Sequence, residues 1–284
     1  MLERALRQPV SAEANAYDRS PSMAEFYDCI EPLATRPDIA FYVAAARECG
    51  GPILELGCGT GRILIPTARA GIEISGVDGS ECMLAACRGR VAGEAVDVQR
   101  RISLHQGDIR AFHLARRFRL ITMPFRLFQY LLTVEEQLAC LAAVHRHVEP
   151  EGSLILDVAE PSIYKLASPL DATDVVAEET PALPDGRKIV RRHRTLDRDL
   201  CSQTFSTELA FHVTYPDGRS QDFAHQHRFR YLFRFELEHL LARAGFIIRD
   251  VYSGFDRSPY GSTYPSDLVI IAVPELRSAV VRTC

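Results

Sequence analysis

A glycine-rich turn between an apolar segment and a helical one is the feature that most constrains this sequence. It runs Glu55-Leu-Gly57-Cys-Gly59-Thr-Gly61-Arg62 and follows the apolar residues Ile53 and Leu54. Glycine lets the backbone turn tightly after a strand and approach a ligand closely. The dinucleotide-binding pattern Gly-x-Gly-x-x-Gly would require a third glycine at position 62, where this chain has arginine. The turn therefore predicts a strand, a ligand-binding loop and a helix, and it disfavours a nicotinamide-dependent oxidoreductase.

Short apolar strands alternate with helical stretches through the first half of the chain. Ser80 is placed to cap a helix, and Thr133-Val-Glu-Glu136 fits a capping box. Alternation of this kind predicts a doubly wound, mostly parallel α/β sheet. The expected strands are 53–56, 72–77, 102–105, 118–123 and 153–158, and the expected helices are 60–70, 81–89 and 133–147.

The pattern changes between about residues 174 and 231, where strand-like alternation and turn sequences replace helices. Leu183-Pro-Asp-Gly186 and Tyr215-Pro-Asp-Gly218 are turn sequences between such runs. We expect an antiparallel unit of three or four strands inserted into the main domain. A helix at 234–244 and strands at 246–253 and 267–273 then close the sheet. The expected division is a main domain of residues 1–160 and 233–284, with lid helices over 1–50, and an inserted cap over 161–232.

Charge and cysteine content disfavour several other classes of protein. The formal net charge is −4 and the pI is near 6.2, whereas nucleic-acid-binding domains usually have a pI above about 9. The eight cysteines form no Cys-x-x-Cys pair, so we expect reduced thiols and no metal site. The first residues are too polar for a secretory leader, and no run of about 18 apolar residues is present. We therefore expect a cytoplasmic protein with no membrane or nucleic-acid partner.

Two acidic motifs follow the glycine turn at the ends of later strands. Asp78 ends the second expected strand, and Gly107-Asp108-Ile109 follows the third. Together with the turn, they resemble the motifs of class I S-adenosylmethionine (SAM)-dependent methyltransferases. The resemblance covers nearly the whole chain and implies a seven-stranded Rossmann-like sheet. It is to the branch that acts on amino sugars and other small natural products, in which a β-rich cap is inserted.

The resemblance places SAM at the glycine turn. It implies that Glu55 supports the amino group of the cofactor, that Asp78 accepts the ribose hydroxyls, and that Asp108 accepts from the adenine amine. The full set of residues expected to bind the cofactor is Tyr27, Tyr42, Glu55, Gly57, Cys58, Gly59, Gly61, Arg62, Asp78, Gly79, Met83, Asp108, Ile109, Met123 and Pro124.

Five members of this set have an alternative interpretation. For the acids Asp78 and Asp108 the alternative is a helix cap or a surface turn. Tyr27 and Tyr42 fall in the expected lid helices, where the resemblance implies that aromatic hydroxyls contact the carboxylate of the cofactor. Arg62 is a further candidate for that carboxylate. Tyrosines buried in the core and an arginine on a helix surface are the alternatives.

The segment Met123–Leu131, after the fourth strand, is expected to border the methyl acceptor. The family version ends in Gln-His-Leu, with the histidine as a candidate base, whereas this chain has Gln129-Tyr130-Leu131. Tyrosine has an unperturbed pKa near 10, which favours hydrogen bonding by Tyr130 over proton abstraction. Arg126 is a candidate for binding a carboxylate or phosphate of the acceptor, or for a salt bridge in the loop.

Two histidines of the expected cap are also candidates. His225 and His227 share a strand face with Phe223, Phe229 and Tyr231, so they line either a pocket or a core. Asp157 and Glu160 follow as pocket candidates, because ligands bind at the carboxyl ends of strands in open α/β sheets. The expected catalytic set is Tyr130, Arg126, Gln129, His227 and His225.

The expected function is in-line transfer of the SAM methyl group to a nitrogen or oxygen of a small molecule, which leaves S-adenosyl-L-homocysteine. SAM carries an activated methyl group, so alignment of the reactants supplies much of the catalysis. The alternatives are an RNA or protein methyltransferase and a SAM-binding protein without turnover. A homodimer formed through the cap is expected by analogy alone.

Overall fold

The computed structural model describes residues 24, 26, 36–170, 176–179, 183 and 185–275. The strands of the central sheet are β1 (Ile53–Leu56), β2 (Ile74–Asp78), β3 (Ile102–Gln106), β4 (Phe118–Met123), β5 (Val148–Ala159), β10 (Phe246–Tyr252) and β11 (Asp267–Pro274). A second sheet contains β6 (Val176–Glu179), β7 (Lys188–Asp199), β8 (Thr204–Thr214) and β9 (Ser220–Arg230). The helices are α3 (Asp38–Cys49), α4 (Leu64–Arg69), α5 (Glu81–Ala92), α6 (Val96–Gln99), α7 (Val134–His147), α8 (Ile163–Ala167) and α9 (Arg234–Arg243), with a 3-10 helix, η2 (Leu127–Tyr130).

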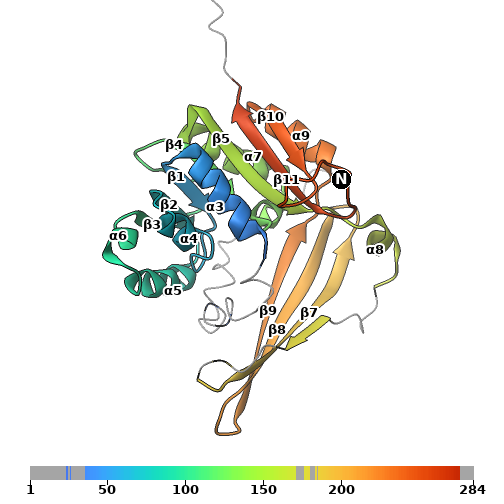
Figure 1. Cartoon of the computed structure of the whole chain (residues 1–284). Coiled ribbons are helices and arrows are strands. Elements are labelled where there is room, and N and C mark those ends of the chain that lie inside the picture. The colour runs from blue at the N-terminus through green and yellow to red at the C-terminus, as the bar shows by residue number, and fades with distance from the viewer. Residues whose placement is uncertain are drawn as a thin grey trace, which may run out of the picture.

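The central sheet has the order β10-β11-β5-β4-β1-β2-β3 (Figure 1). From β5 to β3 its neighbouring strands pair in parallel, whereas β11 runs antiparallel to both β5 and β10. The second sheet has the order β6-β7-β8-β9 and is antiparallel throughout. The predicted fold class, a doubly wound seven-stranded α/β sheet with an inserted antiparallel sheet, is confirmed.

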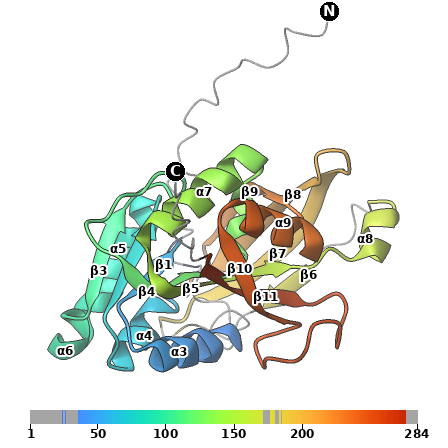
Figure 2. The same cartoon turned by 90° about the horizontal axis from the view of Figure 1, so that it is seen from above.

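Apolar side chains on both faces of the central sheet are buried under helices. Along β5, Leu154 and Leu156 join the core that contains α7 and α9, while Ile155 joins the core that contains α3 and α4. Figure 2 shows these two pairs of helices on opposite sides of the sheet. Burial on both faces explains the continuous apolar runs at 154–156 in β5 and 268–272 in β11.

Two helix starts follow the local signals in the sequence. The Ser80 hydroxyl accepts a hydrogen bond from the Met83 N–H and caps α5. Thr133 and Glu136 form the complete capping box at the start of α7. Each cap satisfies backbone donors that a helix N-terminus otherwise leaves unpaired.

Some boundaries differ from those expected. The helix predicted from residue 60 begins at Leu64, because Gly59 and Gly61 have φ values of +53° and +87°, outside the helical range. Strand β5 begins at Val148, which pairs with Phe118 before a register shift. The helices α6 and α8 were not predicted, since four or five residues are too few to show a helical period.

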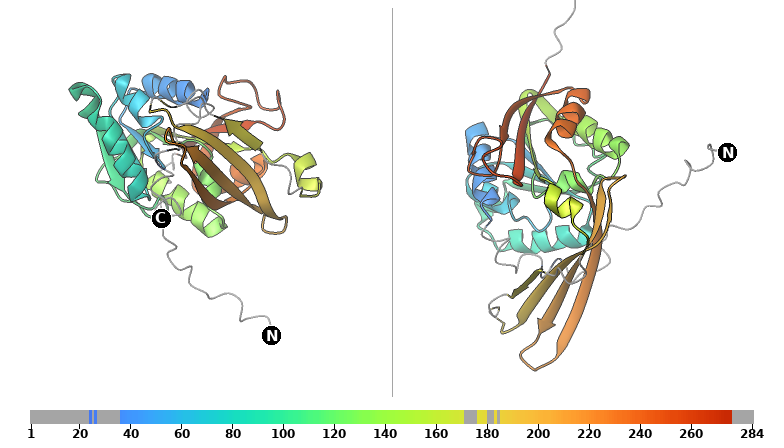
Figure 3. Two further views of the ribbon diagram at one scale, coloured as in Figure 1. Left: turned by 90° about the horizontal axis from the view of Figure 1, so that it is seen from below. Right: turned by 90° about the vertical axis from the view of Figure 1, so that its right-hand side faces the viewer.

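The second sheet projects from the central one as a curved layer (Figures 1 and 3). The chain enters it after β5 and leaves it at α9. One of its faces buries Ile189, Leu209 and Phe211, which pack with Phe26 from the N-terminal segment and with Phe125 from the turn after β4. The inserted sheet is thus joined to the main body through apolar contacts. Within the described ranges, no helix has the length and apolarity needed to cross a membrane.

Candidate functional site

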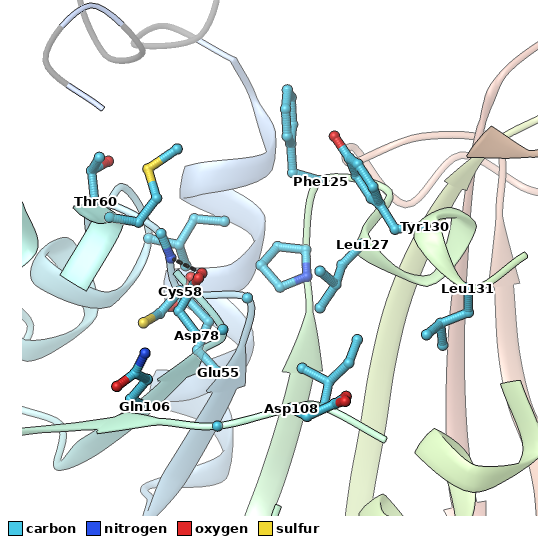
Figure 4. A pocket seen from close by; sticks show the side chains of 18 of the residues that line it. Glu55, Cys58, Thr60, Asp78, Gln106, Asp108, Phe125, Leu127, Tyr130 and Leu131 are labelled. Atoms are coloured by element: carbon cyan, nitrogen blue, oxygen red, sulfur yellow. Dashed lines mark hydrogen bonds between the residues drawn. The ribbon is translucent and has the colours of Figure 1, made fainter. Parts of the chain in front are cut away.

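A pocket of about 720 Å³ lies where β1, β2, β3 and β4 end (Figure 4). Each segment that follows one of these strands contributes to its wall, as expected for an open α/β sheet. The lining residues are Glu55, Gly57, Cys58, Gly59, Thr60, Arg62, Ile63, Asp78, Gly79, Met83, Gln106, Gly107, Asp108, Ile109, Arg110, Pro124, Phe125, Leu127, Tyr130, Leu131 and Glu136.

The glycine turn fits its surroundings only because two of its residues lack side chains. Gly57 has a φ of +64°, and a Cβ atom there would lie 2.6 Å from Leu127 Cδ1. At Gly61, a Cβ atom would lie 2.8 Å from Cys87 Sγ. Gly59 also has a positive φ, but among the described residues no atom outside its two chain neighbours lies within 4 Å of its Cβ position. The backbone of Gly59 therefore faces open space at the pocket wall.

Asp78, at the end of β2, holds this turn in place. Its Oδ2 atom accepts a hydrogen bond from the Gly59 N–H at 2.8 Å, and its Oδ1 atom accepts one from the Ser80 N–H at 2.8 Å. Asp78 also lines the pocket, and a carboxylate is a suitable acceptor for a ligand hydroxyl.

Glu55, at the end of β1, is a buried acid beside the turn. Its side chain lines the pocket, the residue is 2% exposed, and no described residue gives its Oε2 atom a hydrogen bond. Burial raises the pKa of Glu55 to about 8, and the neighbouring Asp78 and Asp38 also raise it, whereas Arg62 opposes the shift. A buried carboxylate oxygen without a partner calls for a cationic or hydrogen-bond-donating ligand.

Arg62 is held by the first residue of α3. Its guanidinium makes two hydrogen bonds to the Asp38 carboxylate, at 2.8 and 2.6 Å. The same guanidinium lies 5.0 Å from the centre of the Phe125 ring. Arg62 thus lines the pocket while it fixes α3 and Phe125, so its use for a ligand carboxylate stays a prediction.

The part of the pocket that is lined by the segment after β3 is polar. Asp108 accepts hydrogen bonds from the Arg110 guanidinium at 2.7 to 3.0 Å, and Arg110 also donates to Glu136. The hydrogen bonds from Arg110 are the largest cause that keeps the pKa of Asp108 below its usual value. Asp108 is therefore an ionised acceptor near neutral pH, as an adenine-binding role requires.

The opposite end of the pocket is aromatic and meets the inserted sheet. Figure 4 shows Phe125 and Tyr130 together, on the side away from Gln106 and Asp108. The Tyr130 ring lies 4.5 Å from the Phe229 ring and 6.0 Å from the His227 ring, between centroids. Tyr130 thus belongs to the pocket wall and also contacts β9.

The two cap histidines lie behind Tyr130 and do not line the pocket. His227 Nε2 lies 2.7 Å from the Thr207 hydroxyl, and its ring stacks on that of His225. Burial lowers the pKa of His227 to about 3, with His225 and His193 contributing. Burial also lowers the pKa of His225. Both rings are neutral near pH 7 and are weak bases, which favours hydrogen bonding over proton abstraction.

Several residues of the predicted set lie outside the pocket wall. Gly61 packs against α5, Met123 is in the core, and the Tyr42 hydroxyl donates to Asp157 at 2.7 Å. Tyr42 therefore corresponds to the alternative of a core tyrosine. Tyr27 lies outside the described residues.

Two residues of the turn after β4 make scaffold contacts. Arg126 forms a salt bridge with Asp267 at 2.8 Å. A salt bridge was the alternative to acceptor binding in the sequence analysis. Gln129 is buried, accepts from the Ala159 N–H and donates to the Arg230 carbonyl. Both groups of the Gln129 amide are thus used to join η2 to β5 and β9.

The two acids at the end of β5 do not line the pocket either. Glu160 accepts hydrogen bonds from the backbone N–H and the hydroxyl of Ser266. The Asp157 carboxylate accepts hydrogen bonds from the backbone N–H groups of Phe125 and Arg126 in the turn after β4. Sequence reasoning missed Phe125, Leu127, Arg110 and Glu136 as individual site residues, although two of them stand in the segment expected to border the acceptor.

Comparison with known proteins identifies the domain that carries this pocket. The family described as a methyltransferase domain matches residues 53–152, which span β1 to the start of β5. A dTDP-3-amino-3,4,6-trideoxy-alpha-D-glucopyranose N,N-dimethyltransferase of Streptomyces venezuelae is 32% identical over 124 residues. The alignment covers 44% of this chain and 49% of that protein. Residues 53–152 of this chain therefore match a methyltransferase domain, as the motifs predicted.

Solved structures resemble this chain over most of its length. The CcbJ methyltransferase from Streptomyces caelestis has a TM-score of 0.73 at 23% identity, with 92% of this chain and 100% of that chain covered. The glycopeptide N-methyltransferase MtfA complexed with S-adenosyl-L-homocysteine has a TM-score of 0.55 at 26% identity, over 84% and 89% of the two chains. By contrast, the aligned part of this chain spans only about half the length of the Streptomyces venezuelae relative. The predicted family is confirmed.

Proposed function

We propose that this methyltransferase transfers the methyl group of SAM to an amine nitrogen of a small molecule, such as an amino sugar or a related natural product. The observation that carries the proposal is the position of Tyr130, which lines the cofactor pocket and contacts β9 of the inserted sheet. An acceptor held between this sheet and the pocket would meet the methyl group at Tyr130 and Phe125. The Streptomyces venezuelae relative, an N,N-dimethyltransferase of an amino sugar, supports this class of acceptor.

We propose that three acids of the pocket bind SAM. Glu55 offers a buried carboxylate oxygen that has no partner among the described residues, which suits the ammonium group of the cofactor. Asp78 would accept from the ribose hydroxyls and Asp108 from the adenine amine. The complex of MtfA with S-adenosyl-L-homocysteine supports the same cofactor for this chain. Bound SAM supplies an electrophilic methyl group, and the chain supplies alignment and exclusion of water.

Nitrogen is favoured over oxygen because none of the described residues on the acceptor side of the pocket is a strong base. The residues that line it are Phe125, Leu127, Tyr130 and Leu131. The pKa of His227 is lowered to about 3, so it would be a poor acceptor for the proton of a hydroxyl. A neutral amine attacks with its own lone pair and loses its proton after transfer, whereas a hydroxyl benefits from a general base. We propose that Tyr130 orients the acceptor through its hydroxyl and its ring.

We further propose that residues 161–232 form the substrate cap of a main domain built from residues 1–160 and 233–284. The cap is supported by the antiparallel sheet β6–β9 and by its contact with Tyr130. A homodimer through this cap and a cytoplasmic location are parts of the same proposal. Light scattering of the purified protein tests the dimer, and fractionation of the source cells tests the location.

The acceptor is tested with matched pairs of small molecules. The enzyme is incubated with SAM and an amino sugar, and separately with the same sugar carrying a hydroxyl in place of the amine. We expect S-adenosyl-L-homocysteine and a methylated product from the amine only. Methylation of the hydroxyl analogue alone would overturn the choice of nitrogen. Binding of SAM without turnover of any small acceptor would favour an RNA or protein substrate, tested next, or a non-catalytic role.

A further inference from the structure

Asp157 lies near the end of β5, is 0% exposed, and is surrounded by hydrogen-bond donors. Its Oδ1 atom accepts from the Tyr42 hydroxyl at 2.7 Å and from the Phe125 N–H at 2.8 Å. Its Oδ2 atom accepts from the Arg126 N–H at 3.1 Å. Two of the three donors are consecutive backbone groups of the turn after β4, so one side chain holds that turn at both oxygens.

The turn that Asp157 holds has an unusual backbone. Phe125 and Arg126 have φ values of +58° and +62°, which is the left-handed region that residues with side chains rarely adopt. Two such residues in succession persist only where surrounding contacts fix them. The hydrogen bonds to Asp157 are contacts of this kind, because they bind the N–H groups of both residues.

The conformation of this turn decides what faces the acceptor. Phe125 lines the pocket, and the guanidinium groups of Arg36 and Arg62 lie 5.2 and 5.0 Å from the centre of its ring. The helix η2 follows directly and carries Leu127 and Tyr130 into the pocket wall. A change of backbone at residues 125 and 126 would therefore displace the aromatic wall of the site.

We propose that Asp157 is a positioning residue of methyl transfer, which holds the turn after β4 so that Phe125 and Tyr130 face the acceptor. This inference rests on the proposed function. Asp157 does not line the pocket, and it contacts the turn through two backbone N–H groups and α3 through the Tyr42 hydroxyl. The acids assigned to the cofactor, Glu55 and Asp78, lie at the ends of β1 and β2, outside the turn that Asp157 holds.

The variant Asp157→Asn tests the proposal because asparagine keeps the size of the side chain but replaces one oxygen with an NH2 group. That group would face at least one donor, so a backbone N–H of the turn would lose its acceptor. Asp267→Asn is the matched control. Asp267 is on the adjacent strand β11 and contacts the same turn, but only through the Arg126 side chain.

Three quantities are measured for each protein: amide hydrogen exchange of residues 125–131, the dissociation constant of SAM, and kcat with the amine found in the acceptor screen. For Asp157→Asn we expect faster exchange in this segment, a SAM dissociation constant within about threefold of wild type, and a kcat about 100-fold lower, the size of loss that a misplaced reactant produces. The Asp267→Asn control should keep wild-type exchange at residues 125 and 126 and most of its kcat.

Unchanged amide exchange in Asp157→Asn, or a kcat within about threefold of wild type, overturns the proposal. A parallel loss of SAM binding and kcat also overturns it, because the role would then be structural. Should the variant fail to fold, the wild type decides the matter: the amides of Phe125 and Arg126 must exchange slowly. A wild-type enzyme that binds SAM but methylates no acceptor refutes the proposed function, while amide exchange still tests whether Asp157 holds the turn.

Discussion

The backbone N–H of Gly59 donates to the Asp78 carboxylate at 2.8 Å, which joins the glycine turn to the end of β2. The same carboxylate accepts from the Ser80 N–H, so it also fixes the start of α5. Asp78 therefore shapes the pocket in addition to the ribose contact proposed for it. This double role means that a change at Asp78 should alter ligand binding through both effects.

Replacement of Asp78 by asparagine is expected to lower SAM affinity by about 100-fold or more, because hydrogen bonds to a charged acceptor each contribute about 1.5–3 kcal/mol. Calorimetric titration measures the affinity. Asp217→Asn is the matched control, since Asp217 accepts from the Arg219 N–H two residues later in the same manner but does not line the pocket. Wild-type affinity in Asp78→Asn would remove the assignment of this acid to the cofactor.

Gly57 and Gly59 should respond differently to the same substitution. In Gly57→Ala the new Cβ atom meets Leu127 at 2.6 Å at a positive φ, so we expect a loss of about 2–4 kcal/mol in the free energy of unfolding. In Gly59→Ala the space around the Cβ atom is open, and only backbone strain of about 1 kcal/mol remains. Urea denaturation measures both. Equal losses in the two variants would contradict the tight contact between Gly57 and Leu127.

Binding of SAM should release a proton from Glu55. The pKa of Glu55 is raised to about 8 in the ligand-free protein, chiefly by burial, so the group is mostly protonated at pH 7. An ammonium group beside it lowers its pKa again, and the affinity for SAM should rise with pH up to about 8. Titrations at pH 7 in two buffers with different ionisation enthalpies report the released protons.

Glu55→Gln provides the control for this proton release, since glutamine does not titrate. Its titrations should lose the part of the buffer dependence that comes from this site. The raised pKa also means that the favourable contribution of Glu55 to stability is lost as pH rises from about 4.5 towards 8. The glutamine variant should therefore gain stability relative to wild type over this range. Identical binding enthalpies of the wild type in both buffers would argue against the proposed role of Glu55.

Tyr130 should act mainly through its ring. Removal of the hydroxyl in Tyr130→Phe leaves the contacts with Phe229 and His227, so we expect kcat to stay within about tenfold of wild type. Tyr130→Ala removes the wall between the pocket and β9 and should lower kcat by about 100-fold through loss of alignment. Steady-state kinetics with the acceptor amine distinguish the two variants. If Tyr130→Phe lowers kcat as much as Tyr130→Ala does, the hydroxyl itself takes part in the chemistry.

Most of the architecture follows from local patterns in the sequence. The apolar strands, the capping box at Thr133 and the N-cap at Ser80 each depend on residues a few positions apart, and the structure confirms them. The inserted antiparallel sheet was predicted in the same way, from alternation and from the turn that ends at Gly218. The cofactor pocket was predicted in outline because its walls follow the strand ends in order.

Contacts between distant segments were not predictable from these patterns. Arg62 pairs with an acid 24 positions earlier, Asp157 holds backbone groups about 30 positions away, and Gln129 reaches the Arg230 carbonyl across 101 positions. The sequence shows that these residues are polar, but their partners depend on how the strands are ordered and where the turns lie. For this reason Arg126 and Gln129 were expected to face the acceptor, whereas the structure uses them to join segments.

The measurement that tests the central claim most directly is calorimetric titration of the purified protein with SAM, with S-adenosyl-L-homocysteine and with NADH. We predict dissociation constants in roughly the micromolar range for SAM and its demethylated product, and no binding of NADH. Failure of both SAM and S-adenosyl-L-homocysteine to bind, or binding of NADH in their place, would contradict the assignment of the glycine turn to a methyltransferase cofactor.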